Sequence, residues 1–124
     1  KIEPNLGRGV PTILYDYPVC MAALSRKKPT DPRFAERFEV YVGDTELGNA
    51  FSELTDAAEQ RRRFEYDMDL KEKLYGERYP IDDDFINAVA AMPEAAGIAI
   101  GVDRLVMLVA GVTRIEDAMW APVA

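Results

Sequence analysis

The chain has 124 residues with a formal net charge of −7, and 48% of its residues are hydrophobic, which is enough for one domain with a core. The acidic balance makes it a poor candidate for binding nucleic acid by itself, since free-standing binders are usually basic. One cysteine and no histidine exclude an intrachain disulfide and Ser-His or Cys-His catalysis. With no apolar run near the ~18 residues of a membrane span and no signal-peptide pattern, we expect a cytoplasmic protein without membrane contact.

Turn-forming residues break up the first third of the chain, and a short strand is expected between them at Thr12–Tyr17. A half-buried strand follows at about Glu36–Val42, where apolar and polar residues alternate. Gly43-Asp44 then fits a two-residue hairpin turn, and a second strand is expected from Thr45 to about Leu54.

Helix signals dominate the rest of the chain. Asp56 with Glu59 three residues later is typical of a helix start, and Gly76 is a natural stop. The further expected elements are helices at about 56–75, 82–92, 103–110 and 115–120 and a strand at 97–102. Strands and helices are mixed without a regular βαβ alternation, which favours an α+β fold with an antiparallel sheet flanked by helices.

The predicted hairpin brings two carboxylates together. With Gly43-Asp44 as the turn, Glu39 and Glu46 are diagonal neighbours on one face, roughly 7–8 Å apart at Cα. Two carboxylates at this spacing can hold one hard cation, and Mg²⁺ is typically bound by one or two carboxylates together with substrate phosphates. The alternative interpretation is that both are solvated residues on the outer face of the sheet.

A third carboxylate, Glu53, lies beside Phe51 and Leu54, where burial is costly unless the carboxylate meets a cation. This favours a site for an amino acid or an amine. Glu46 and Glu53 are an odd number of residues apart, so a bulge near Gly48 or a bend would be needed to bring them into one pocket. The alternative is an ordinary edge strand that enters a capped helix.

Small residues alternate with Ile and Val in the segment Gly97–Val102. This pattern is typical of a strand in which one face carries only small side chains. A flat ligand can lie against such a face, and Arg104 at its end adds a positive charge, which together suggest a nucleotide. The spacing matches neither the P-loop nor the dinucleotide fingerprint. The alternative is close packing of a helix on the strand, with Arg104 in a surface salt bridge.

Two further features favour structural roles. Arg61-Arg62-Arg63 is surrounded by acidic residues, so a solvated helix face is a better interpretation than a nucleic-acid patch. Cys20 is most simply a small buried apolar residue.

Three segments stand out together, and they are Arg37–Tyr41, Glu46–Gln60 and Gly97–Leu108. Their order, spacing and residues resemble the C-terminal part of the class II lysyl-tRNA synthetase catalytic domain, and the last one is similar to the third class II signature motif. The resemblance covers most of the chain from about Pro11 onward. Two related families fit: lysyl-tRNA synthetase itself and its shortened paralogue, the elongation factor P–lysine ligase.

The choice between the two families depends on a few positions. Leu14–Pro18, Met21–Leu24 and Ala99 look like the paralogue, whereas Gly48 is the synthetase-like residue. The resemblance therefore favours ATP-dependent activation of lysine or β-lysine, as an aminoacyl-adenylate, and its transfer to a lysine of elongation factor P. Charging of tRNA(Lys) by a lysyl-tRNA synthetase is the alternative.

The resemblance implies that one group of residues handles ATP. Glu39 and Glu46 would hold Mg²⁺ against the ATP phosphates, and Glu46, Leu47 and Gly101 would contact the nucleotide. Arg104 would bind the terminal phosphates and help pyrophosphate to leave, which makes it the implied catalytic residue.

A second group would hold the amino-acid substrate. By resemblance, Glu53 would receive an amino group, Asn49 would lie nearby, and Ala99 would line the pocket where the α- or β-amino group lies. The substrate carboxylate would attack the α-phosphate of ATP in line, which needs positioning and charge neutralisation rather than a general base.

The first two class II motifs do not appear in the sequence. The resemblance therefore implies that residues 1–124 are a single domain, the C-terminal portion of a class II catalytic core with motif 3 at 97–108. We expect this piece alone to be inactive and the full-length family member to be a homodimer. The non-enzyme alternative is a truncated, catalytically inactive synthetase-like interaction module.

Overall fold

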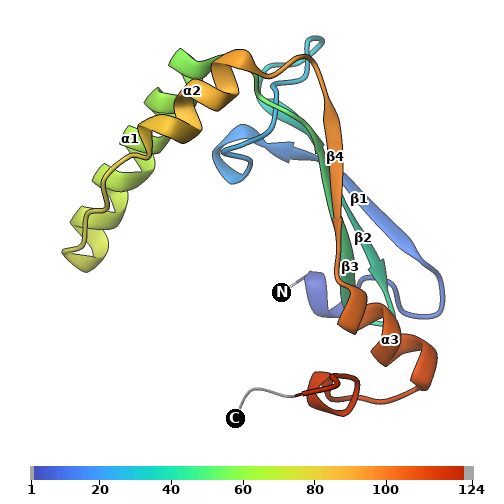
Figure 1. The fold of residues 1–124 in the computed structure, drawn as a ribbon. Helices are drawn as coiled ribbons and strands as arrows, with labels where there is room; N and C mark the ends of the chain where they lie inside the picture. The colour runs from blue at the N-terminus through green and yellow to red at the C-terminus, as the bar shows by residue number, and fades with distance from the viewer. Residues whose placement is uncertain (1, 122–124) are drawn as a thin grey trace. The chain divides into compact units, whose positions relative to one another are not determined.

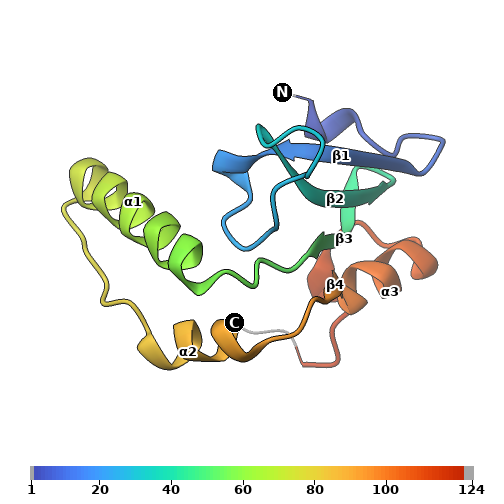
Figure 2. The ribbon, with the colours of Figure 1, turned by 90° about the horizontal axis from the view of Figure 1, so that it is seen from above.

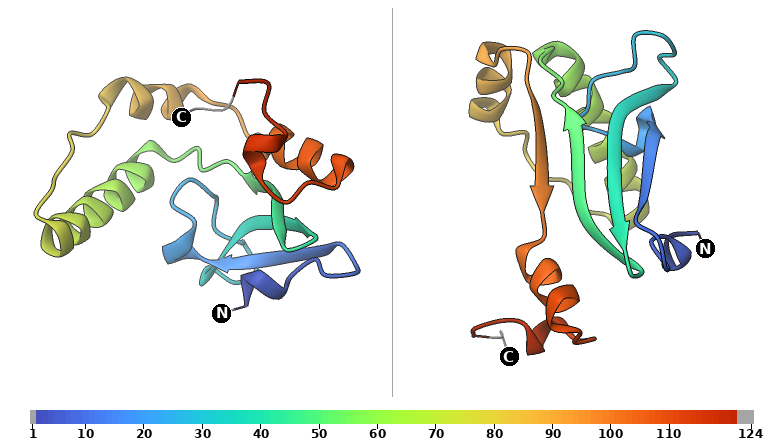
Figure 3. Two further views of the ribbon diagram at one scale, coloured as in Figure 1. Left: turned by 90° about the horizontal axis from the view of Figure 1, so that it is seen from below. Right: turned by 90° about the vertical axis from the view of Figure 1, so that its right-hand side faces the viewer.

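The computed structural model describes residues 2–121 and contains one four-stranded sheet in the order β1-β2-β3-β4 (Figure 1). The strands lie side by side in this order in Figure 3. Their bounds are Thr12–Pro18 for β1, Phe34–Val42 for β2, Thr45–Ser52 for β3 and Ala96–Ile100 for β4. The main helices are α1 at Ala57–Tyr75, α2 at Asp83–Ala91 and α3 at Val102–Ala110. The predicted α+β fold with an antiparallel sheet is confirmed.

The β2–β3 connection is the predicted two-residue turn. Gly43 and Asp44 both have positive φ angles, +56° and +69°, which is the backbone of the tight hairpin turns that match strand twist. Asp is one of the few residues besides glycine that tolerates this region. The Asp44 carboxylate also accepts a hydrogen bond from Nε of Arg8 at 2.6 Å.

Chain contacts divide the protein into two compact units, and each is described by itself. The first unit contains the N-terminal residues up to Tyr15, the segment Arg37–Ala50 and the residues from Ile98 onward. The second contains Asp16–Glu36 and Phe51–Gly97. Every strand therefore contributes residues to both units. That the whole chain forms part of one larger domain stays a prediction.

In the second unit, α1 begins and ends where the sequence predicts. The Asp56 side chain accepts a hydrogen bond from the Glu59 N–H at 2.9 Å, and Gly76 closes the helix in the left-handed conformation. An extended linker then returns the chain to α2 (Figure 2), whose first turn is capped by Asp82. The two helices meet where the Phe64 and Phe85 rings lie 5.7 Å apart.

In the first unit, β4 leads into α3, which ends at Gly111 in the left-handed conformation. None of the residues of β4 or α3 is buried. The short helix expected at 115–120 is instead one 3₁₀ turn, η3, at Ile115–Asp117. No helix within residues 2–121 is both long enough and apolar enough to span a membrane.

Candidate functional site

All of the predicted site residues except Glu53 lie in the first unit, and they are Glu39, Glu46, Leu47, Asn49, Ala99, Gly101 and Arg104. They come from β2, from β3, and from β4 with the start of α3. The hairpin turn and the β3–β4 pairing bring these three segments together.

Glu39 is buried, with a side chain only 8% exposed. Its carboxylate pairs with Arg37 through Oε1 and accepts the Tyr41 hydroxyl through Oε2, at 2.5 Å in the second case. These three residues alternate along β2, so they share one of its faces. The interpretation of Glu39 as a solvated residue of an outer face is therefore wrong. A buried carboxylate needs such partners, because it is costly to bury alone.

Asn49 on β3 is tied to the same arginine. The Arg37 Nε donates a hydrogen bond to Oδ1 of Asn49 at 3.1 Å. The Gly101 N–H donates to the Leu47 carbonyl at 3.0 Å, and this antiparallel register places Asn49 opposite Ala99 on β4. The structure thus brings together two residues that the resemblance assigns to the substrate.

Glu46 and Arg104 also meet. Nη1 of Arg104 donates to the Glu46 carbonyl oxygen at 2.7 Å and lies 3.7 Å from the Glu46 carboxylate. A Cβ on Gly101 would lie 3.1 Å from Cδ of Arg104, so the absence of a side chain at Gly101 leaves room for the arginine stem. Glu46 and Arg104 line an open cavity of about 440 Å³ in the first unit, together with Arg8 and Tyr41.

Glu53 belongs to the second unit. Its backbone N–H donates to the Ala95 carbonyl at 2.9 Å, and its Oε1 lies 3.4 Å from where a Cβ of Gly97 would be. Among residues 2–121, no side chain forms a hydrogen bond or an ion pair with this half-buried carboxylate. It therefore has acceptor capacity available for an ammonium group.

In the first unit, Glu39 and Glu46 are the carboxylates that the sequence predicts as ligands of a cation. An ionised carboxylate offers about four acceptor positions, so contacts with Arg37 and Tyr41 do not by themselves exclude metal binding by Glu39. In the described part of the chain, no group of three or more Asp, Glu, Cys or His side chains could hold a metal by itself. Glu39 and Glu46 would need phosphate oxygens to complete the coordination of Mg²⁺.

The arginine run on α1 differs from its predicted solvated face at one position. Arg61 and Arg62 form ion pairs with Asp83 and Glu59, but the Arg63 side chain is only 11% exposed. Its Nη1 donates to the carbonyls of Ala22, at 3.0 Å, and Ser25, at 2.8 Å, and so anchors the segment before β2. Burial of the arginine depends on this distant segment, which local charge patterns do not reveal.

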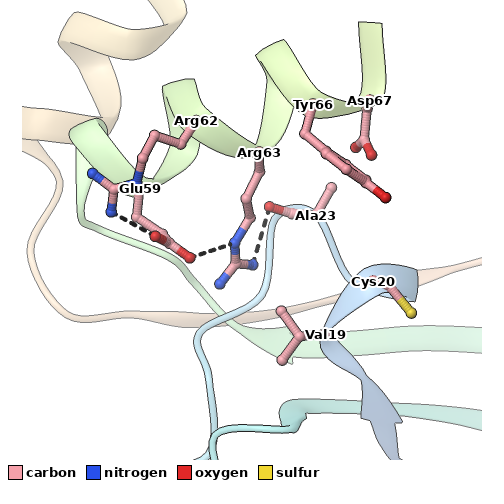
Figure 4. Close-up of a pocket in the computed structure, with 8 residues that line it drawn as sticks. All are labelled: Val19, Cys20, Ala23, Glu59, Arg62, Arg63, Tyr66 and Asp67. Carbon is pink, nitrogen blue, oxygen red and sulfur yellow. Dashed lines mark hydrogen bonds and ion pairs between the residues drawn. The ribbon is translucent and has the colours of Figure 1, made fainter. Parts of the chain in front are cut away.

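Cys20 is exposed, so the prediction of a buried cysteine is wrong. It lies on the 3₁₀ turn η2, Val19–Met21, which contains no buried residue. Cys20 lines a cavity of about 300 Å³, with Arg63 and Tyr66 of α1 among the other lining residues. Figure 4 draws these residues as sticks.

Arg37 and Tyr41 are the site residues that sequence reasoning missed. Their signal was the alternation of Arg37, Glu39 and Tyr41 along one strand, which places a cation and a hydroxyl on either side of the predicted metal ligand. By itself, that pattern indicates only the polar side of a half-buried strand.

Comparison with known proteins gives this arrangement a context. The family model described as tRNA synthetases class II (D, K and N) matches residues 5–123. The chain is 47% identical over 123 residues to the elongation factor P–(R)-β-lysine ligase of Proteus mirabilis, which covers 98% of this chain and 38% of the relative. Proteins of the same name from Salmonella arizonae and Histophilus somni are each 44% identical over 119 residues, covering 95% of this chain and 37% of their own length.

The chain therefore spans little more than a third of the length of these relatives. The family model, in contrast, matches nearly all of it. On this ground the chain belongs to the class II tRNA synthetase family of the D, K and N group.

Proposed function

We propose that this chain is part of an ATP-dependent ligase that activates lysine or β-lysine and transfers it to a lysine of elongation factor P. The names of the relatives support the substrate and the acceptor. The structural observation that carries the proposal is the meeting of Arg104 with Glu46 beside an open cavity. This places a cation next to a candidate metal ligand, as the polyphosphate of ATP requires.

On the nucleotide side, Arg104 binds the terminal phosphates and neutralises charge on the departing pyrophosphate. Glu46 and Glu39 would hold Mg²⁺, which would supply positive charge to screen the phosphate oxygens from the attacking carboxylate. Leu47 and Gly101 contact the nucleotide through their backbone. Gly101 has no side chain to collide with the Arg104 side chain.

On the substrate side, Glu53 accepts the amino group, and Asn49 and Ala99 of the first unit contact the substrate. The substrate carboxylate attacks the α-phosphate, forming the aminoacyl-adenylate while the bond to pyrophosphate breaks. Positioning and charge neutralisation suffice for this displacement, so the lack of histidine is no obstacle. We place this ligase in the cytoplasm and expect it to act as a homodimer.

Charging of tRNA(Lys) is the second candidate, and Gly48 is the feature that favours it. The deciding experiment uses the complete protein that the gene encodes, with α-lysine and (R)-β-lysine as substrates and elongation factor P and tRNA(Lys) as acceptors. We expect lysine-dependent ATP–pyrophosphate exchange and labelled elongation factor P. Efficient charging of tRNA(Lys) with no transfer to elongation factor P would overturn the proposal.

A pair of variants tests the substrate side. Glu53→Gln removes the charge without changing shape, so it should abolish lysine-dependent exchange. Glu65→Gln, on the exposed face of α1, should leave it unchanged. We also expect the 124-residue chain alone to form no adenylate, and exchange by it at a normal enzymatic rate would contradict this expectation.

A further inference from the structure

Arg37 contacts two residues that the proposed function assigns to different ligands. From one guanidinium, Nη2 pairs with Glu39 and Nε donates to Asn49 Oδ1 at 3.1 Å. The arginine side chain is 17% exposed and that of Glu39 is 8% exposed, so both groups are largely removed from water. Hydrogen bonds to charged groups are among the stronger ones, and breaking one in a buried setting is costly.

The bond from Arg37 determines which atom of Asn49 remains for a ligand. Arginine carries only donors, so its partner on the amide has to be the oxygen. The nitrogen Nδ2 then becomes the group available to a ligand, and among residues 2–121 it has no hydrogen-bond partner. Asn49 therefore offers two N–H donors and has its carbonyl oxygen engaged.

We propose that Arg37 is a positioning residue of the substrate site, which fixes the Asn49 amide so that its N–H donors face the ligand. The ligand group at Asn49 is then an acceptor, such as a carboxylate oxygen, rather than an ammonium. The planar fork of arginine spans Glu39 and Asn49 at once, which the single ammonium of lysine does not do in a fixed geometry. The role of Arg37 toward the substrate rests on the proposed function, whereas its contact with Asn49 does not.

The first experiment tests the contact in the chain itself, by ¹H–¹⁵N spectra of the side-chain amides. Asn49→Ala assigns the Asn49 peaks. In Arg37→Lys we expect those peaks to shift, because the donor at Oδ1 is lost. Arg33→Lys, which changes an exposed arginine paired with Asp31, should leave them in place. Unchanged Asn49 peaks in Arg37→Lys would overturn the inference, whatever substrate the enzyme uses.

The second experiment measures steady-state kinetics of the complete protein. Asn49→Asp keeps an acceptor for Arg37 but removes both donors, so it separates a structural contact from a positioning one. We expect Asn49→Asp and Arg37→Lys each to raise KM for the amino-acid substrate about tenfold or more. KM for ATP should change far less, because Asn49→Asp keeps Arg37 and the lysine of Arg37→Lys keeps a positive charge to pair with Glu39. The double variant Arg37→Lys/Asn49→Ala should raise KM for the amino-acid substrate no more than Asn49→Ala alone, because Arg37 acts on this substrate through Asn49.

The outcomes separate this inference from the proposed function. Wild-type kinetics in Asn49→Asp would overturn the positioning role. The same conclusion would follow if the increases in KM from Arg37→Lys and Asn49→Ala multiplied in the double variant. If the complete protein activates neither lysine isomer, the proposed function fails, while the amide spectra still decide the Arg37–Asn49 contact. Should Arg37→Lys fail to fold, Asn49→Asp carries the test, since its arginine keeps both partners.

Discussion

At the residue scale, Arg104 shows how a single side chain depends on its neighbours. Its stem lies over Gly101 and its guanidinium reaches the Glu46 carbonyl, so its head group is held next to a carboxylate. The side chain is still 45% exposed, which leaves donors for a ligand in the cavity that it lines.

Replacing Arg104 by Ala in the complete protein is expected to lower kcat for ATP–pyrophosphate exchange by about 10²-fold or more, because a positioned donor to developing charge is lost. Arg104→Lys should recover part of the loss, since it keeps the charge but not the planar fork. Arg114→Ala changes an exposed arginine paired with Glu116 and serves as the control. Equal rates for Arg104→Ala and Arg114→Ala would contradict the assignment.

Ala99 lies opposite Asn49 in the β3–β4 register, and we propose that its methyl group limits the room for the substrate there. Ala99→Gly enlarges the pocket by about one methyl, a change worth roughly 10-fold or more in substrate discrimination. We expect the ratio of kcat/KM for (R)-β-lysine to that for α-lysine to change by this order. Kinetics with each isomer measure it, and an unchanged ratio would place Ala99 outside the substrate pocket.

At the element scale, α1 holds the segment that precedes β2. Gln60 and Arg63 donate to carbonyls of residues 22–25, and Glu59 pairs with Lys27 at 2.8 Å. Hydrogen bonds from Lys27, Arg62 and Arg63 hold the pKa of the Glu59 carboxyl at about 2, against an ordinary 4.5.

This depressed pKa makes the second unit sensitive to acid. Because the folded state favours the ionised carboxylate, its stabilising contribution is present above about pH 4.5 and is lost as the pH falls toward 2. In Glu59→Gln, the unfolding midpoint in urea should therefore vary less with pH over this window than in the wild type.

Asp31→Asn is the matched control for this measurement. The pKa of Asp31 is also lowered to about 2, by hydrogen bonds from Arg33, but this pair is exposed and contributes little. If Asp31→Asn reduced the pH dependence of the unfolding midpoint as much as Glu59→Gln, the Glu59–Lys27 ion pair would not be its source.

Local signals predicted the ends of the elements well. Asp56, Gly76 and Gly43-Asp44 act through neighbours within four residues, so their roles are visible in the sequence. Burial was less visible in the sequence: Glu39 is buried and paired with Arg37, while Cys20 is exposed. The bond from Arg37 to Asn49 could not be predicted, because it joins β2 to β3 through side chains, which no residue spacing reveals.

At the scale of the whole molecule, one apolar surface has no cover among the described residues. We call it the β4–α3 surface, and it consists of Ile98, Ile100, Val102, Leu105, Val106 and Val109. Val109 is 82% exposed. Exposed apolar side chains on two successive elements are typical of an interaction site, and β4 is also the last strand in the sheet order.

We therefore expect the isolated chain to self-associate in a concentration-dependent way, measurable by sedimentation equilibrium. Val109→Lys should weaken the association, because a charge would enter the apolar contact. Tyr75→Lys changes a residue at the end of α1 that is 73% exposed and should have little effect. A strictly monomeric wild-type chain would contradict the prediction and would count against a simply truncated synthetase-like module.

The two-residue turn at Gly43-Asp44 also bears on the order in which the site forms. A hairpin closes over very short sequence separations, on the order of microseconds, whereas Arg104 is 58 residues from its contact at Glu46. We expect the candidate metal ligands to be set by an early local event and the phosphate-binding arginine to arrive late. During folding, the candidate metal ligands Glu39 and Glu46 would thus come together before Arg104 reaches them.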